Sequence, residues 1–95
     1  MRVVASAAAA SRVEEQGGRL FVWPRTSAGC CRGRLTYLEA ATEAPPGVFR
    51  RVGGDSFEVF LDARMRRAPD ELHVELHGRR HPRLAAYWNG CAYVL

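Results

Sequence analysis

Hydrophobic and polar residues alternate with a period of two along much of the chain, and this alternation is typical of half-buried β-strands. The clearest example covers residues 72–77, where Leu72, Val74 and Leu76 alternate with three polar residues. Successive side chains of a strand point to opposite faces, so we expect these three residues to face the core. Similar segments predict further strands at residues 1–5, 20–23, 35–40, 48–52, 57–61, 84–88 and 91–95.

One segment has the pattern of a helix instead. Ser6 can act as its N-cap, because a serine hydroxyl accepts a backbone N–H, and the four alanines that follow are good helix formers. Gly17-Gly18 supplies the stop, since glycine tolerates the left-handed conformation beyond a helix end. We therefore expect a helix over residues 7–16. The residues expected to face the core are Ala9, Ala10 and Val13.

Glycine, proline and asparagine mark the turns between these elements. Gly53-Gly54-Asp55 lies between two strand segments and predicts a hairpin, and Asn89-Gly90 is a second turn signal. Pro24 either ends the strand before it or places that strand at a sheet edge, because proline has no N–H to donate. Residues 62–69 predict a turn or a short helical excursion.

The composition is that of one ordinary globular domain covering residues 1–95, with 47% hydrophobic and 25% charged residues. We expect an α+β fold that is mostly β, with one N-terminal helix and two small packed sheets, mixed or antiparallel. No apolar run approaches the ~20 residues of a membrane helix, and the start of the chain is too weakly hydrophobic for a signal peptide. Three cysteines cannot all pair within one chain. We therefore expect a cytoplasmic protein with free thiols and no membrane contact.

All fourteen basic residues are arginines, and the formal net charge is +4. Acidic residues interrupt the groups of arginines in the second half of the chain. Attraction of nucleic acid requires clustered charge of one sign. The mixed charges favour a solvated surface over a nucleic-acid interface, and they leave an arginine-rich interaction module as a third functional class.

The residues with the most evident chemistry lie in one short segment, Gly29-Cys30-Cys31-Arg32-Gly33. Thiolates bind metals and attack electrophiles, and the neighbouring guanidinium groups favour the thiolate form. Cysteine can also be a small buried hydrophobe. A loop rich in glycine and arginine nevertheless favours a chemical role for both cysteines.

A disulfide between Cys30 and Cys31 would be strained. Their Cα atoms are ~3.8 Å apart across a trans peptide, which is less than the ~4.4–6.8 Å usual in disulfides. A strained disulfide is easily reduced. A metal-free thiol redox protein acting through this pair is therefore the alternative to a metal-binding protein.

The order of elements resembles the HesB/IscA-like family, the A-type iron–sulfur carriers. That family has a short strand, an alanine-containing helix, a strand, a Ser-Gly-Cys-x-Gly loop and then an aromatic-containing strand. Residues 6–15 resemble the helix, residues 25–33 the cysteine loop and residues 35–39 the strand after it. The hairpin centred on Gly54 and the segment Tyr87-Trp88-Asn89 are similar to later parts of the family pattern.

This resemblance implies a metal or iron–sulfur cluster binding protein that assembles or carries clusters, rather than an enzyme. It implies that Cys30 or Cys31, together with Cys91, holds an iron–sulfur cluster or iron, with zinc as another candidate metal. One chain offers three thiols where a cluster commonly takes four ligands. We therefore expect a homo-oligomer, with iron–sulfur assembly or recipient proteins as partners. The family normally carries Cys-x-Cys beyond the Asn, whereas this chain has only Cys91 after Asn89, so we expect a divergent member.

The remaining candidates have simpler explanations. Cys91 begins an apolar run, residues 91–95, so core packing is the alternative to metal ligation. His73 and His77 share a strand face but lie ~13 Å apart, too far to hold one ion together. His77 and His81 span a bend and are the better pair, yet we expect surface histidines. No Ser/His/Asp order, phosphate loop or pair of catalytic carboxylates indicates an enzyme.

Overall fold

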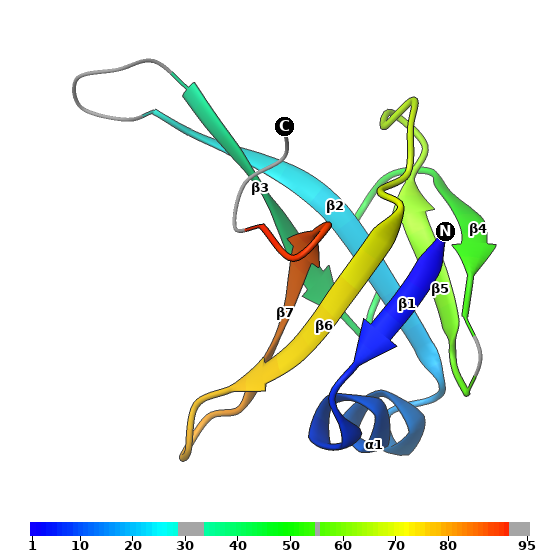
Figure 1. Ribbon diagram of the computed structural model, residues 1–95, viewed down its shortest axis with the longest axis vertical. Helices are drawn as coiled ribbons and strands as arrows, with labels where there is room; N and C mark the ends of the chain where they lie inside the picture. The colour runs from blue at the N-terminus through cyan, green and yellow to red at the C-terminus, as the bar shows by residue number, and fades with distance from the viewer. Residues whose placement is uncertain (29–33, 55, 92–95) are drawn as a thin grey trace.

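The structure is a computed structural model that describes residues 1–28, 34–54 and 56–91. Within these ranges the regular structure comprises one helix and seven strands (Figure 1). Their bounds are β1 Arg2–Ala5, α1 Ala7–Glu15, β2 Arg19–Ala28, β3 Arg34–Ala41, β4 Phe49–Gly53, β5 Glu58–Asp62, β6 Glu71–His77 and β7 Arg83–Trp88.

The seven strands join one mixed sheet in the order β1-β6-β7-β3-β2-β5-β4. β1 runs parallel to β6 and β2 runs parallel to β5, whereas the other neighbouring strands are antiparallel. The mostly β class with one N-terminal helix is confirmed. The expectation of two separate sheets is corrected, because the strands form one sheet. A single pair between β3 and β7, Glu39 with Ala85, joins a three-stranded part to a four-stranded part.

The helix follows its sequence signals closely. The Ser6 side chain accepts a hydrogen bond from the backbone N–H of Ala9 at 3.2 Å, which caps the first turn. Gly17 and Gly18 both have positive φ angles, so the chain leaves the helix where the sequence predicts. Ala9 and Val13 are fully buried, and Ala10 packs against the core as a partly buried neighbour.

The core lies on one face of the sheet, which we call the inner face, and α1 covers part of it. Alternate residues of the central strands point there, so the period-two pattern of the sequence becomes a layer of aliphatic side chains. Burial of one such side chain contributes about 1.5–3 kcal/mol. The largest fully buried residues are Leu20, Leu61, Leu72, Val13, Val22, Val59 and Val74.

Pro24 does not end its strand. β2 continues to Ala28, and Pro24 lies opposite Leu38 of β3. The parallel partner β5 pairs with β2 only as far as Val22. One side of β2 is therefore an open edge at Pro24, where a missing N–H removes no bond from the ladder.

The predicted hairpin is present as β4 and β5, which pair antiparallel with a register shift between Arg51 and Gly53. Gly54 has a φ of +125°, and a Cβ atom there would collide with the backbone of Phe57. The turn therefore requires glycine at this position.

After the hairpin, the predicted excursion at residues 62–69 consists of turns and bends without a helix. Asp62 holds its first turn, because its carboxylate accepts hydrogen bonds from the backbone N–H of Arg64 at 2.9 Å and from the Arg64 guanidinium. Elsewhere, α1 spans nine residues, and no helix in the described ranges has the length and apolar character needed to cross a membrane.

Candidate functional site

The cysteine segment is bracketed by a long β-hairpin. β2 and β3 pair along eight residues, and the last pair, Ala28 with Arg34, stands on either side of residues 29–33. Figure 1 shows these two strands extending away from the rest of the sheet. Cys30 and Cys31 lie outside the described residues, so their predicted proximity to Cys91 stays a prediction.

Cys91 is an exposed, free cysteine at the end of a tight turn. Its N–H donates to the Trp88 carbonyl at 2.7 Å, and its carbonyl accepts from the Trp88 N–H at 3.0 Å. The two residues between them, Asn89 and Gly90, have φ angles of 49° and 79°. Positive φ at both central positions is the signature of a type I′ turn, which Asn-Gly favours. The alternative that Cys91 packs in the core is therefore wrong: the turn reverses the chain before Cys91 reaches the interior.

Two hydrogen bonds fix this turn to Glu71 of the neighbouring strand β6. The Asn89 N–H donates to the Glu71 carbonyl, and the Asn89 side-chain oxygen accepts from the Glu71 N–H, both at 2.8 Å. Trp88 is buried to 6% exposure, and the Arg67 guanidinium carbon lies 5.8 Å from the centre of its ring. The backbone of Cys91 is thus held by a rigid support while its side chain faces solvent.

His73 lies beside this turn, a relation that the sequence analysis missed. A Cβ atom at Gly90 would stand 3.6 Å from His73 Nε2, so the imidazole packs against the backbone next to Cys91. His73 Nε2 also lies 3.2 Å from a carboxylate oxygen of Glu71. The only sequence signal was the position of His73 on the polar face of its strand. Its approach to Gly90 arises from the pairing of β6 with β7.

The described histidines do not form a metal site. His77 Nε2 is hydrogen-bonded to the Tyr87 hydroxyl at 2.7 Å, and His81 lies in the bend after β6. No group of three or more His, Cys, Asp or Glu side chains in the described part of the chain is arranged to hold a metal ion. Cys91 therefore fits a metal or cluster only together with donors from outside that part, where the sequence has two further thiols, Cys30 and Cys31.

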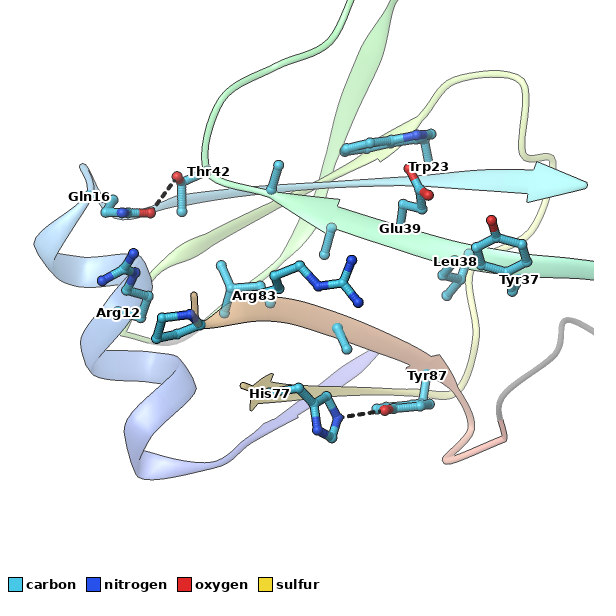
Figure 2. Close-up of a pocket in the computed structure, with 15 residues that line it drawn as sticks. Arg12, Gln16, Trp23, Tyr37, Leu38, Glu39, Thr42, His77, Arg83 and Tyr87 are labelled. Atoms are coloured by element: carbon cyan, nitrogen blue, oxygen red, sulfur yellow. Dashed lines mark hydrogen bonds between the residues drawn. The ribbon is translucent and has the colours of Figure 1, made fainter. Parts of the chain in front are cut away.

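A second feature is a groove of about 680 Å³ along the seam between β3 and β7 (Figure 2). Arg12 of α1 and Gln16, the residue that follows this helix, lie at one end, and Tyr37 and Tyr87 lie at the other. Gln16 accepts a hydrogen bond from Thr42 at 2.7 Å, which closes the helix side of the groove. Its residues come from five separate elements, so no local sequence motif predicts it.

Two solved structures are similar to this chain in fold. Escherichia coli SufA, described as involved in the biosynthesis of iron–sulfur clusters, is 14% identical; the match covers 99% of this chain and 93% of that one, with a TM-score of 0.50. IscA with a 2Fe–2S cluster is 15% identical over 90% of this chain and 81% of that one, with a TM-score of 0.48. No protein-family model and no curated protein matches the sequence. The arrangement of one helix and a mixed sheet, together with the match to SufA over almost the whole chain, shows that this protein has the HesB/IscA-like fold.

Proposed function

We propose that this protein binds an iron–sulfur cluster, or iron, and carries it as cargo for iron–sulfur cluster assembly. The observation that carries this proposal is the exposed Cys91 thiol on a clamped turn of a HesB/IscA-like fold. A carrier must hold its cargo where a partner can reach it. The hydrogen-bonded turn positions the Cys91 sulfur to hold cargo, and the exposure of this sulfur lets a partner reach it.

The ligands in this proposal are Cys30, Cys31 and Cys91. Iron–sulfur clusters are bound by cysteine thiolates, commonly four per cluster. One chain is a ligand short, so two or more chains share the cluster in a homo-oligomer. The partners are iron–sulfur assembly proteins that load the cluster and recipient proteins that take it. Free thiols of this kind persist in the reducing cytoplasm, where we place the protein.

Anaerobic reconstitution tests the proposal. Protein incubated with iron and sulfide should gain visible absorption and shift towards a dimer or tetramer in size-exclusion chromatography. Single Cys30→Ser, Cys31→Ser and Cys91→Ser variants should lose most of the absorption. His81→Gln is the matched control, because it changes an exposed side chain of a type that can bind metals but that lies outside the proposed site. Parallel metal analysis distinguishes iron from zinc.

Two results would overturn the proposal. Iron that binds without sulfide-dependent colour, and equally well to all three cysteine variants, would be adventitious. Protein that gains no colour but forms a Cys30–Cys31 disulfide in mildly oxidising buffer, detected by mass spectrometry, would instead support the metal-free thiol redox function.

A further inference from the structure

The groove between β3 and β7 exists because these strands pair at one position. Glu39 and Ala85 are directly opposite each other, and the described residues on either side of them make no further β3–β7 pairs. The volume of about 680 Å³ lies within the range of small-molecule sites in proteins, roughly 300–1,000 Å³. Three of the lining residues of β3 and β7 have small side chains, which leaves space between the two strands. These are Ala40, Ala41 and Ala85.

The unneutralised charge in the groove is positive. Arg12 and Arg83 both line it, and neither guanidinium has a hydrogen bond or ion pair with any residue that the structure describes. Glu39 is the one acidic residue among the described lining residues, and its carboxylate accepts hydrogen bonds from Arg25 at 3.1 and 3.2 Å. An anion entering the groove would therefore meet two arginines that have no partner among the described residues, and a glutamate that is already paired.

Aromatic rings occupy the same groove. Trp23, Tyr37 and Tyr87 are each half-buried. The Tyr87 hydroxyl is held by the 2.7 Å hydrogen bond to His77, which fixes the orientation of its ring. Figure 2 shows the Arg83 side chain lying in the gap between the two strands, with its guanidinium directed towards the end where Tyr37 and Tyr87 stand.

We propose that this groove binds a small organic anion that carries an aromatic ring. The carboxylate or phosphate of the ligand pairs with the Arg83 guanidinium, whose planar donors match such groups in a bidentate geometry. The ring packs between Tyr37 and Tyr87, and Arg12 adds positive charge at the far end. The site is separate from the three thiols of the proposed carrier function and does not depend on it.

Titration with phenylacetate tests the site, because this probe joins a carboxylate to a phenyl ring. Trp23 lines the groove and Trp88, the other tryptophan, is buried, so binding should change the intrinsic fluorescence in a saturable manner. We expect a Kd in the region of 1 mM or tighter, which corresponds to about −4 kcal/mol. Acetate carries the charge without the ring and benzyl alcohol carries the ring without the charge. Each should bind at least about tenfold more weakly.

Matched variants locate the site. Arg83→Gln should weaken phenylacetate binding about fivefold to tenfold, whereas Arg80→Gln, which removes an exposed arginine that does not line the groove, should have no effect. Tyr37→Ser should weaken phenylacetate but not acetate. Circular dichroism and the melting temperature confirm that each variant folds. Calorimetry on Trp23→Phe separates loss of binding from loss of the fluorescence signal.

Three outcomes would overturn the proposal. Equal binding of acetate and phenylacetate would show a general anion effect, and equal weakening by the two arginine variants would show long-range surface charge only. Failure to saturate at about ten times the expected Kd would show that no site exists. Phenylacetate binding that persists when Cys30→Ser, Cys31→Ser and Cys91→Ser lose their cluster would show that the two proposals stand independently.

Discussion

The two faces of strand β6 differ in burial and in the chemistry of their side chains. Leu72 and Val74 point inward and have 0% exposure. His73 and Glu75 point outward, remain half-exposed, and lie opposite Tyr87 and Ala85 of β7. The inner face is aliphatic and closely packed, whereas the outer face carries aromatic, basic and imidazole groups beside the groove.

This difference separates stability from binding. Hydrophobic burial supplies most of the favourable free energy of folding, and here it is concentrated on the inner face. Among the described groups proposed to bind ligand or cargo, Tyr37 and Tyr87 lie on the outer face and Cys91 lies at a turn. Substitutions on the two faces should therefore change different measurable quantities.

The largest stability effect is expected on the inner face. Leu72→Ala should lower the free energy of unfolding by about 2–5 kcal/mol, because it removes buried methyl groups and leaves a cavity. His73→Ala, one residue along the same strand, should cost less than about 1 kcal/mol. Urea unfolding measures both. Equal losses at the two positions would contradict the separation of the faces.

The turn that carries Cys91 should show an intermediate effect. Asn89→Ala removes the acceptor for the Glu71 N–H and places alanine at a φ of 49°, so we expect a loss of about 1–2 kcal/mol. Asn89→Asp keeps the acceptor and should therefore retain most of the stability that Asn89→Ala loses, as measured by thermal unfolding. If Asn89→Ala has the same free energy of unfolding as the wild type, these hydrogen bonds do not stabilise the turn.

Asp62 is a buried carboxylate at the end of β5, and it should give a smaller, pH-dependent effect. The hydrogen bond from the Arg64 side chain lowers the pKa of Asp62 below its ordinary value of 3.8. Its contribution is therefore fully present above about pH 3.8 and is lost as the pH falls through the lowered value. Arg64 is 79% exposed, so solvent screens the pair.

Asp62→Asn tests this effect. We expect a loss of about 1 kcal/mol at neutral pH, and the difference from wild type should shrink in strong acid. Urea unfolding at several pH values measures it. A difference that grows on acidification would have the wrong sign and would contradict this role for Asp62.

The smallest stability effect is expected at Cys91. Because its side chain is exposed, Cys91→Ser should change the free energy of unfolding by less than about 0.5 kcal/mol. The same variant should lose most of the reconstituted cluster absorption, so stability and cargo binding would be fully uncoupled at this residue. A loss of several kcal/mol in thermal unfolding would show that the thiol is packed.

Local features of the fold were predictable from the sequence. Ser6 caps the helix and Gly17-Gly18 ends it, because capping depends on residues within one turn. The β4–β5 hairpin followed from its turn residues. Pro24 was harder to interpret, because a proline ends a strand in the middle of a sheet but is tolerated in a strand with an open edge. The outcome depends on how far the neighbouring strand β5 extends, and β5 pairs with β2 only as far as Val22.

The three-cysteine site stays a prediction, because two of its residues lie outside the described part of the chain. Its thiols could be named from the sequence, but the exposure of Cys91 could not, since an apolar run favours burial equally well. The Asn89-Gly90 turn decides the matter by reversing the chain before the run begins. The contact of His73 with this turn and the five-element groove depend on strand pairings that no local pattern encodes.

The sequence alone determined which residues face inward, because side-chain direction follows from the local geometry of each strand and helix. It also determined where the three cysteines and fourteen arginines stand along the chain. Only the tertiary structure decided that β1 pairs with β6, which lies some seventy residues later, and that β3 meets β7 at a single pair. Such pairings depend on the closure of long loops and the packing of the whole core, and these long-range contacts create the groove.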